Sequence, residues 1–125
     1  MSDGRTQRAL DILAAIGTGV VPLAPFTPDA RWWWNGGLDL AVAEFAALLA
    51  DLHGRTEDGI AITPGLILAQ DDSVMIEATS AARLTNGRIY DNRYIFLFHF
   101  AGEAIRAVRE YSDSAHVNAV FDLGG

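Results

Sequence analysis

Aromatic side chains recur at every second position along residues 89–100, and one amide stands among them. If the segment is a β-strand, these side chains share one face, because successive side chains of a strand point to opposite sides. An aromatic wall with few polar groups is typical of a pocket for a hydrophobic small molecule. Asn92 and Tyr94 could then hold an oxygen atom of the ligand; the alternative is core packing with internal hydrogen bonds. The face comprises Tyr90, Asn92, Tyr94, Phe96, Phe98 and Phe100, of which we expect Tyr90, Asn92, Tyr94 and Phe96 to contact the ligand.

Two carboxylates, Glu110 and Asp113, stand at the end of the last strand-like segment. Burial in an apolar pocket raises the pKa of a carboxyl group and suits it to proton transfer near neutral pH. Strand alternation places the two on opposite faces unless a bulge intervenes. If both pointed inward they could act as an acid/base pair. Otherwise Glu110 could pair with an arginine of a neighbouring strand, and Asp113 could cap the turn that follows.

Three consecutive tryptophans form a further group of candidate ligand contacts. In a strand, Trp32 and Trp34 face one way and Trp33 the other. We expect Trp32 and Trp34 to line the pocket near its mouth; the alternatives are a plug at the base of the fold or a contact between subunits. Tyr111, between the two carboxylates, is one more candidate for ligand binding.

Composition excludes several kinds of chemistry. All nine basic residues are arginine and there is no cysteine, so lysine Schiff bases, thiolate catalysis, disulfides and cysteine metal sites are excluded. The three histidines lack metal-binding spacing and no glycine-rich nucleotide motif occurs, so we expect neither metal nor cofactor. A net charge of −7 argues against nucleic acid and anionic membranes as partners.

The order of periodic segments predicts one α+β domain over residues 1–125. A helix is expected first, then a short tryptophan strand, a second helix and a meander of long strands with a hairpin turn at Thr85–Arg88. The Pro64-Gly65 pair predicts a bulge or an edge in the first long strand. The tail, Asp113–Gly125, is expected to pack as an extension or at an interface. The expected helices are Thr6–Ile16 and Leu38–His53, and the expected strands are Ala30–Trp34, Ile60–Ala69, Val74–Leu84, Ile89–Phe100 and Ala104–Ser112.

Two runs in this meander carry a family resemblance. Asn86–Phe98 (NGRIYDNRYIFLF) resembles the central hairpin of SnoaL-like proteins, and Ile105–Asp113 (IRAVREYSD) resembles their last strand. These proteins belong to the nuclear transport factor 2-like superfamily, with ketosteroid isomerase and the polyketide cyclases. The resemblance implies a cone-shaped, curved antiparallel sheet covered by the N-terminal helices, a cystatin-like α+β barrel. It also implies a homodimer through the outer sheet face.

The same resemblance implies a role for Asp113, which is similar to the acid/base aspartate that follows an aromatic residue in the polyketide cyclases. The function expected is then a cofactor-free isomerase or cyclase acting on a hydrophobic carbonyl compound, with Asp113 moving the proton. The alternative is a non-catalytic module of the same fold that binds a small molecule or mediates dimerisation. No signal peptide or membrane-spanning run is apparent, and we expect a cytoplasmic protein.

Overall fold

The alternating segments of the second half form one antiparallel meander in the computed structural model, which describes residues 3–121. Side chains along the third of these strands alternate between buried and exposed, so the predicted aromatic face is confirmed as the buried face. The register shifts between Pro64 and Ile67, which confirms the predicted bulge. The meander consists of β3 (Ala61–Gln70), β4 (Ser73–Arg83), β5 (Ile89–Ala101) and β6 (Ala104–Ser112).

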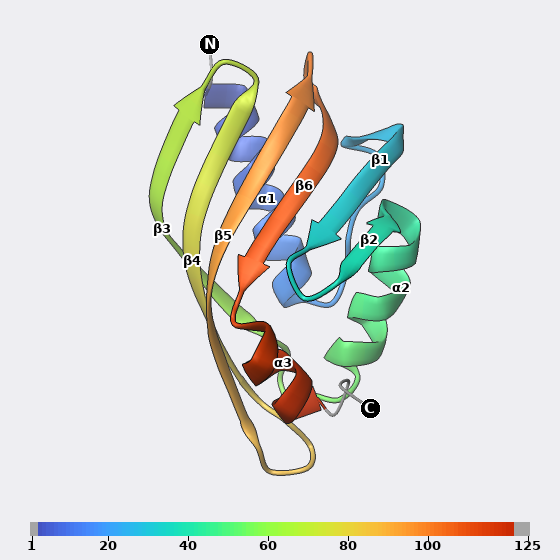
Figure 1. The fold of residues 1–125 in the computed structure, drawn as a ribbon, viewed down its shortest axis with the longest axis vertical. Coiled ribbons are helices and arrows are strands. Elements are labelled where there is room, and N and C mark those ends of the chain that lie inside the picture. The colour runs from blue at the N-terminus through green and yellow to red at the C-terminus, as the bar shows by residue number, and fades with distance from the viewer. Residues whose placement is uncertain (1–2, 122–125) are drawn as a thin grey trace.

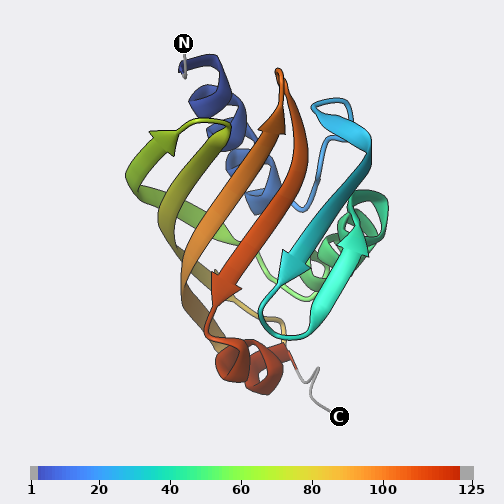
Figure 2. The same cartoon turned by 45° about the horizontal axis from the view of Figure 1, so that its top comes forward.

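The N-terminal half extends this sheet and covers it. The strands follow the order β2-β1-β6-β5-β4-β3, and β1 runs parallel to β6 while all other neighbours are antiparallel. The expected curved sheet is confirmed (Figures 1 and 2), and it is open. Its parallel pair, β1 with β6, makes it mixed, where antiparallel strands were expected. Helices α1 and α2 lie on one side of it, and α3 lies at the end where β6 stops (Figures 1 and 2). The additional elements are α1 (Asp3–Gly17), β1 (Phe26–Trp34), β2 (Leu38–Ala41), α2 (Val42–His53) and α3 (Ser114–Phe121).

The start of the second helix differs from the sequence prediction. Residues 38–41 were expected to be helical but form β2, which pairs with β1 across the Asn35-Gly36-Gly37 turn. Gly37 has a φ of 105°, a conformation that glycine adopts without a steric penalty. The Glu44 side chain accepts a 2.9 Å hydrogen bond from the Ala41 N–H, which satisfies a donor where α2 begins.

The tail contains a helix that the sequence prediction missed. Asp113 precedes α3, and its Oδ1 accepts a 3.1 Å hydrogen bond from the N–H of His116. This is the N-cap geometry that aspartate favours. Val117, Val120 and Phe121, which the prediction left as an extension, are the buried positions of this helix.

The core lies between the buried sheet face and the helices. Ile12 and Leu13 of α1 and Phe98 and Ile105 of the sheet are almost fully buried there. None of the helices within residues 3–121 is both long enough and apolar enough to cross a membrane.

Candidate active site

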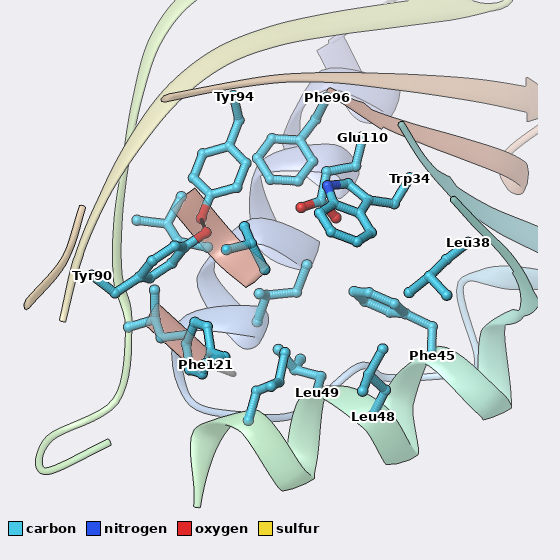
Figure 3. A pocket seen from close by; sticks show the side chains of 15 residues that line it. Trp34, Leu38, Phe45, Leu48, Leu49, Tyr90, Tyr94, Phe96, Glu110 and Phe121 are labelled. Carbon is cyan, nitrogen blue, oxygen red and sulfur yellow. Dashed lines mark hydrogen bonds between the residues drawn. The ribbon is translucent and has the colours of Figure 1, made fainter. Parts of the chain in front are cut away.

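A cavity of about 80 Å³ lies between the sheet and the three helices. A single water needs only about 10–15 Å³, so this space can hold a small guest. Side chains from β1, β5 and β6 form its sheet wall, and those from α2 form the opposite wall (Figure 3). The lining residues are Ile16, Trp34, Leu38, Phe45, Leu48, Leu49, Leu52, Ile60, Ile62, Tyr90, Tyr94, Phe96, Glu110, Val117 and Phe121.

Glu110 is the acidic residue of this lining. It pairs with Phe96 across β5 and β6, which turns its side chain to the aromatic face. The indole Nε1 of Trp32 donates a 2.9 Å hydrogen bond to Glu110 Oε1. The residue is half-buried and lines the cavity. Burial raises the pKa of Glu110 to about 7, and the hydrogen bond from Trp32 opposes that rise.

Glu110 bonds to Trp32, not to the arginine of a neighbouring strand that the sequence suggested. Within residues 3–121 no salt bridge to Glu110 forms. Arg109, the neighbouring basic residue, points to the outer face. Its Cζ atom lies 4.3 Å from the centroid of the Trp33 ring. Strand alternation places Arg109 and Glu110 on opposite faces of the sheet, so this arginine does not pair with the carboxyl.

The tryptophan run divides as strand alternation predicts. Trp32 and Trp34 are buried, and Trp33 lies on the outer face near Tyr111. Trp34 lines the cavity, and its Nε1 donates to Ser112 Oγ at 2.9 Å. Trp32 stays behind the wall, stacked on Phe45 with ring centroids 4.0 Å apart. Trp32, expected to contact ligand, instead holds the carboxyl of Glu110.

Tyr90 and Tyr94 place two hydroxyl groups in the same wall, hydrogen-bonded to each other (Figure 3). Ser80 Oγ lies 2.9 Å from Tyr94 Oη, and Asn92 Nδ2 donates to Tyr90 Oη at 3.1 Å. Burial raises the pKa of Tyr90 to about 12 and that of Tyr94 even higher. Both phenols therefore stay neutral, and they can donate hydrogen bonds to a guest.

Besides Trp32, three sequence-predicted residues lie outside the cavity lining. Asn92 is buried behind Tyr90 and bonds to the backbone of Asp113. Asp113 is exposed and caps α3, so its carboxylate lacks the apolar surroundings that the proposed proton transfer required. Tyr111 lies on the outer face and accepts a hydrogen bond from Arg109 Nε at 3.1 Å. The wall thus brings together Trp34, Tyr90, Tyr94, Phe96 and Glu110.

The far wall contains residues that sequence reasoning did not assign to the site. Phe45, Leu48, Leu49 and Leu52 belong to the apolar stripe of α2, which the sequence displayed as a helix face without indicating a cavity. Val117 and Phe121 of α3 recur at helical spacing, and that signal could have identified the helix. Among residues 3–121, no group of three histidine, aspartate or glutamate side chains is arranged to hold a metal ion.

Comparison with known proteins identifies the fold. No family model matches the sequence, and no curated protein matches it. Solved structures do match over nearly the whole chain. A candidate SnoaL-like polyketide cyclase from Jannaschia sp. CCS1 has 16% sequence identity and a TM-score of 0.74, with 96% of this chain and 94% of that chain covered. A nuclear transport factor 2-like protein from Burkholderia xenovorans LB400 has 21% identity and a TM-score of 0.71, with 94% and 95% covered.

A third solved structure has a named activity. The BvnE pinacolase from Penicillium brevicompactum has 16% identity and a TM-score of 0.77, with 91% of this chain and 89% of that chain covered. At such identities the shared property is the fold, which does not fix an activity. The resemblance read from the two runs of the meander is therefore confirmed in the arrangement of the elements. The chain has the nuclear transport factor 2-like fold, the fold of the SnoaL-like and ketosteroid isomerase-like proteins.

Proposed function

We propose that this protein is a cofactor-free enzyme that moves a proton on a hydrophobic carbonyl compound, as an isomerase or cyclase, with Glu110 as the general acid/base. One observation supports the proposal most: the carboxyl of Glu110 lies in the wall of an apolar cavity with its pKa raised to about 7. A group that titrates near the working pH can both accept and return a proton. Pinacolase and polyketide cyclase, the activities in the names of two structures with this fold, support a small-molecule enzyme.

The proton transfer needs no group beyond the cavity wall. The carboxylate of Glu110 takes a proton from a carbon next to the carbonyl of the substrate. The electron pair of the broken C–H bond forms the C=C bond of an enolate, and the carbonyl oxygen takes the charge. Protonated Glu110 then returns the proton to another atom of the same molecule. Trp34, Tyr90, Tyr94 and Phe96 would contact the substrate, because they line the cavity with Glu110.

Hydrogen–deuterium exchange tests this role without knowledge of the natural substrate. Cyclohexanone in D₂O exchanges the protons next to its carbonyl, and NMR follows their loss. We expect exchange catalysed by the protein to rise with pH through about 7 and then level off, because the ionised carboxylate is the base. Glu110→Gln should lower the catalysed rate by roughly 10²–10⁴-fold, the usual contribution of a general base.

Asp113→Asn is the matched control for this experiment. The carboxylate of Asp113 is exposed and caps α3. The catalysed exchange should therefore persist when asparagine replaces it. The opposite pattern, with loss in Asp113→Asn and full activity in Glu110→Gln, would return the acid/base role to Asp113.

A non-catalytic binding module is the second candidate. The composition of the lining favours it, because the polar side chains there are one carboxyl, two phenols and the indole of Trp34 among aliphatic and phenyl groups. In that case cyclohexanone would bind equally to the unaltered protein and to Glu110→Gln. The protons of cyclohexanone would then exchange no faster in the presence of either protein than in buffer alone.

We also propose a cytoplasmic homodimer that associates through the outer face of the sheet. Leu68 and Ile95 are 54% and 39% exposed there, and Tyr111, paired with Ile95 across β5 and β6, extends the apolar surface. Exposed apolar side chains that gather on one sheet face are typical of sites where proteins associate.

A further inference from the structure

Three hydroxyl groups connect the cavity with the protein surface. Tyr90 and Tyr94 line the cavity and bond to each other, and Tyr94 bonds to Ser80. Ser80 in turn lines a separate surface groove. That groove is formed by Thr79, Ser80, Asp91, Asn92, Arg93 and Asp113. The chain of hydroxyls therefore has one end at the cavity and the other at the groove.

The amide of Asn92 has a fixed orientation. Its Oδ1 lies 2.8 Å from the N–H of Arg93 and 3.1 Å from the N–H of Asp113, and a backbone N–H can only donate. Its Nδ2 therefore faces Tyr90 Oη at 3.1 Å and the carbonyl oxygen of Asp113 at 3.2 Å. Both hydrogens of the amide are thus in use. Asn92 always donates to Tyr90 and cannot accept a hydrogen bond from it.

This constraint leaves three arrangements of the hydroxyl protons, because either oxygen of each pair can be the donor. In the first, Tyr90 donates to Tyr94 and Tyr94 donates to Ser80. In the second, Tyr90 and Ser80 both donate to Tyr94, whose own proton is free for a guest. In the third, Ser80 donates to Tyr94, Tyr94 donates to Tyr90, and the proton of Tyr90 is free for a guest in the cavity. In this third arrangement Tyr90 Oη accepts two hydrogen bonds, from Tyr94 and Asn92, which polarises its O–H and strengthens the bond that it donates.

We infer that Tyr90 is the specificity-determining donor of this cavity: it donates a hydrogen bond to an oxygen atom of the bound molecule, with Tyr94, Ser80 and Asn92 setting its direction. The inference rests on the proposed function, because it needs a guest in the same cavity. It names the substrate class as neutral compounds that carry a hydrogen-bond-accepting oxygen, such as ketones.

The position of Glu110 agrees with that substrate class. Tyr94 stacks on Phe96 with ring centroids 5.0 Å apart, and Phe96 is the cross-strand partner of Glu110. Tyr94 and Glu110 are thus diagonal neighbours on adjacent strands, about 7–8 Å apart in backbone position. Tyr90, Tyr94 and Glu110 line the same cavity, so a molecule bound there has phenol hydroxyls and the carboxyl in one wall.

A matched pair of probes tests the donor. Cyclohexanone and methylenecyclohexane have nearly the same shape, and only the ketone accepts a strong hydrogen bond. Their affinities for the full-length protein and its variants can be measured by NMR titration. Tyr90→Phe should lower the ratio of ketone to hydrocarbon affinity by roughly three- to tenfold, the worth of one neutral hydrogen bond. Tyr94→Phe should lower the ratio less, by about twofold, because Tyr90 can still donate but loses the hydrogen bond from Tyr94 that polarises it. Tyr111→Phe, on the outer face, is the control and should leave the ratio unchanged.

The infrared stretch of ¹³C-labelled cyclohexanone reports the same bond directly. In the unaltered protein the carbonyl band should lie at lower wavenumber than in Tyr90→Phe. Equal bands in these two proteins, or an equal loss of the affinity ratio in Tyr94→Phe, would overturn the assignment. The affinity of the hydrocarbon shows in each variant whether the cavity is intact.

Glu110→Gln separates this inference from the proposed function. The variant should lose proton exchange and keep the carbonyl band in place. If exchange persists in Glu110→Gln while Tyr90→Phe shifts the band, the acid/base role fails and the donor stands. If neither probe binds to the unaltered protein, ligand binding in the cavity and the donor role of Tyr90 both fail.

Discussion

The indole N–H of Trp32 reaches Glu110 Oε1 at 2.9 Å across 78 positions of sequence. Parallel pairing of β1 with β6 brings these two residues together. A donor aimed at a buried carboxyl stabilises its ionised form, so Trp32 keeps the proton affinity of Glu110 from rising further.

Trp32→Phe should therefore raise the pKa of Glu110 above about 7, because the variant keeps an aromatic ring on Phe45 and loses the donor. The ¹³C chemical shift of the labelled Glu110 carboxyl, followed against pH, measures the change. Trp34→Phe is the control, since the indole N–H of Trp34 bonds to Ser112. A pKa that is unchanged or lower in Trp32→Phe would contradict the role of this hydrogen bond.

The burial of Glu110 should make folding stability depend on pH. Its pKa rises from 4.5 in the unfolded chain to about 7 in the folded one, so the folded state holds the proton more tightly. Stability should consequently fall as the pH rises from about 4.5 to about 7, by up to about 3 kcal/mol. Glu110→Gln should lack this part of the decline in urea unfolding curves recorded between pH 5 and pH 8. A decline of the same size in both proteins would show that other groups cause it.

Asn92→Ala should destabilise the protein by about 2–4 kcal/mol, because it removes the acceptor of two part-buried backbone N–H groups and one of the two hydrogen bonds of Tyr90 Oη. It should also lower hydrogen-exchange protection at the start of α3, where Asn92 holds the backbone of Asp113. Asn35→Ala is the matched control: Asn35 bonds in the same two-pronged way to the backbone of Ser112, but from an exposed position. Equal losses of stability in the two variants would contradict the importance of burial.

Ile95→Glu should shift the proposed dimer to monomer, because it replaces an exposed apolar side chain of the outer sheet face by a charged one. Sedimentation equilibrium measures the change in mass. Ile89→Glu, which changes an exposed apolar residue at the far end of β5, is the control. A monomer before any substitution would contradict the proposed dimer.

The sequence by itself determined the elements with strong periodicity. Strict alternation in β5 identified the aromatic face, the hairpin signal at Asn86-Gly87 set the β4–β5 pairing, and Pro64-Gly65 marked the bulge. These features depend on local backbone preferences and on a period of two, so they can be read from a single sequence. The same period placed Glu110 and Asp113 on different faces.

Only the tertiary structure decided which of those faces encloses the cavity. Pairing of Phe96 with Glu110 directs this carboxyl inward, and the chain then leaves the sheet, so that Asp113 is exposed and caps α3. The parallel contact that brings Trp32 to Glu110 joins segments nearly 80 residues apart. Such long-range pairing depends on how the whole sheet curves around its core, and no local pattern encodes it.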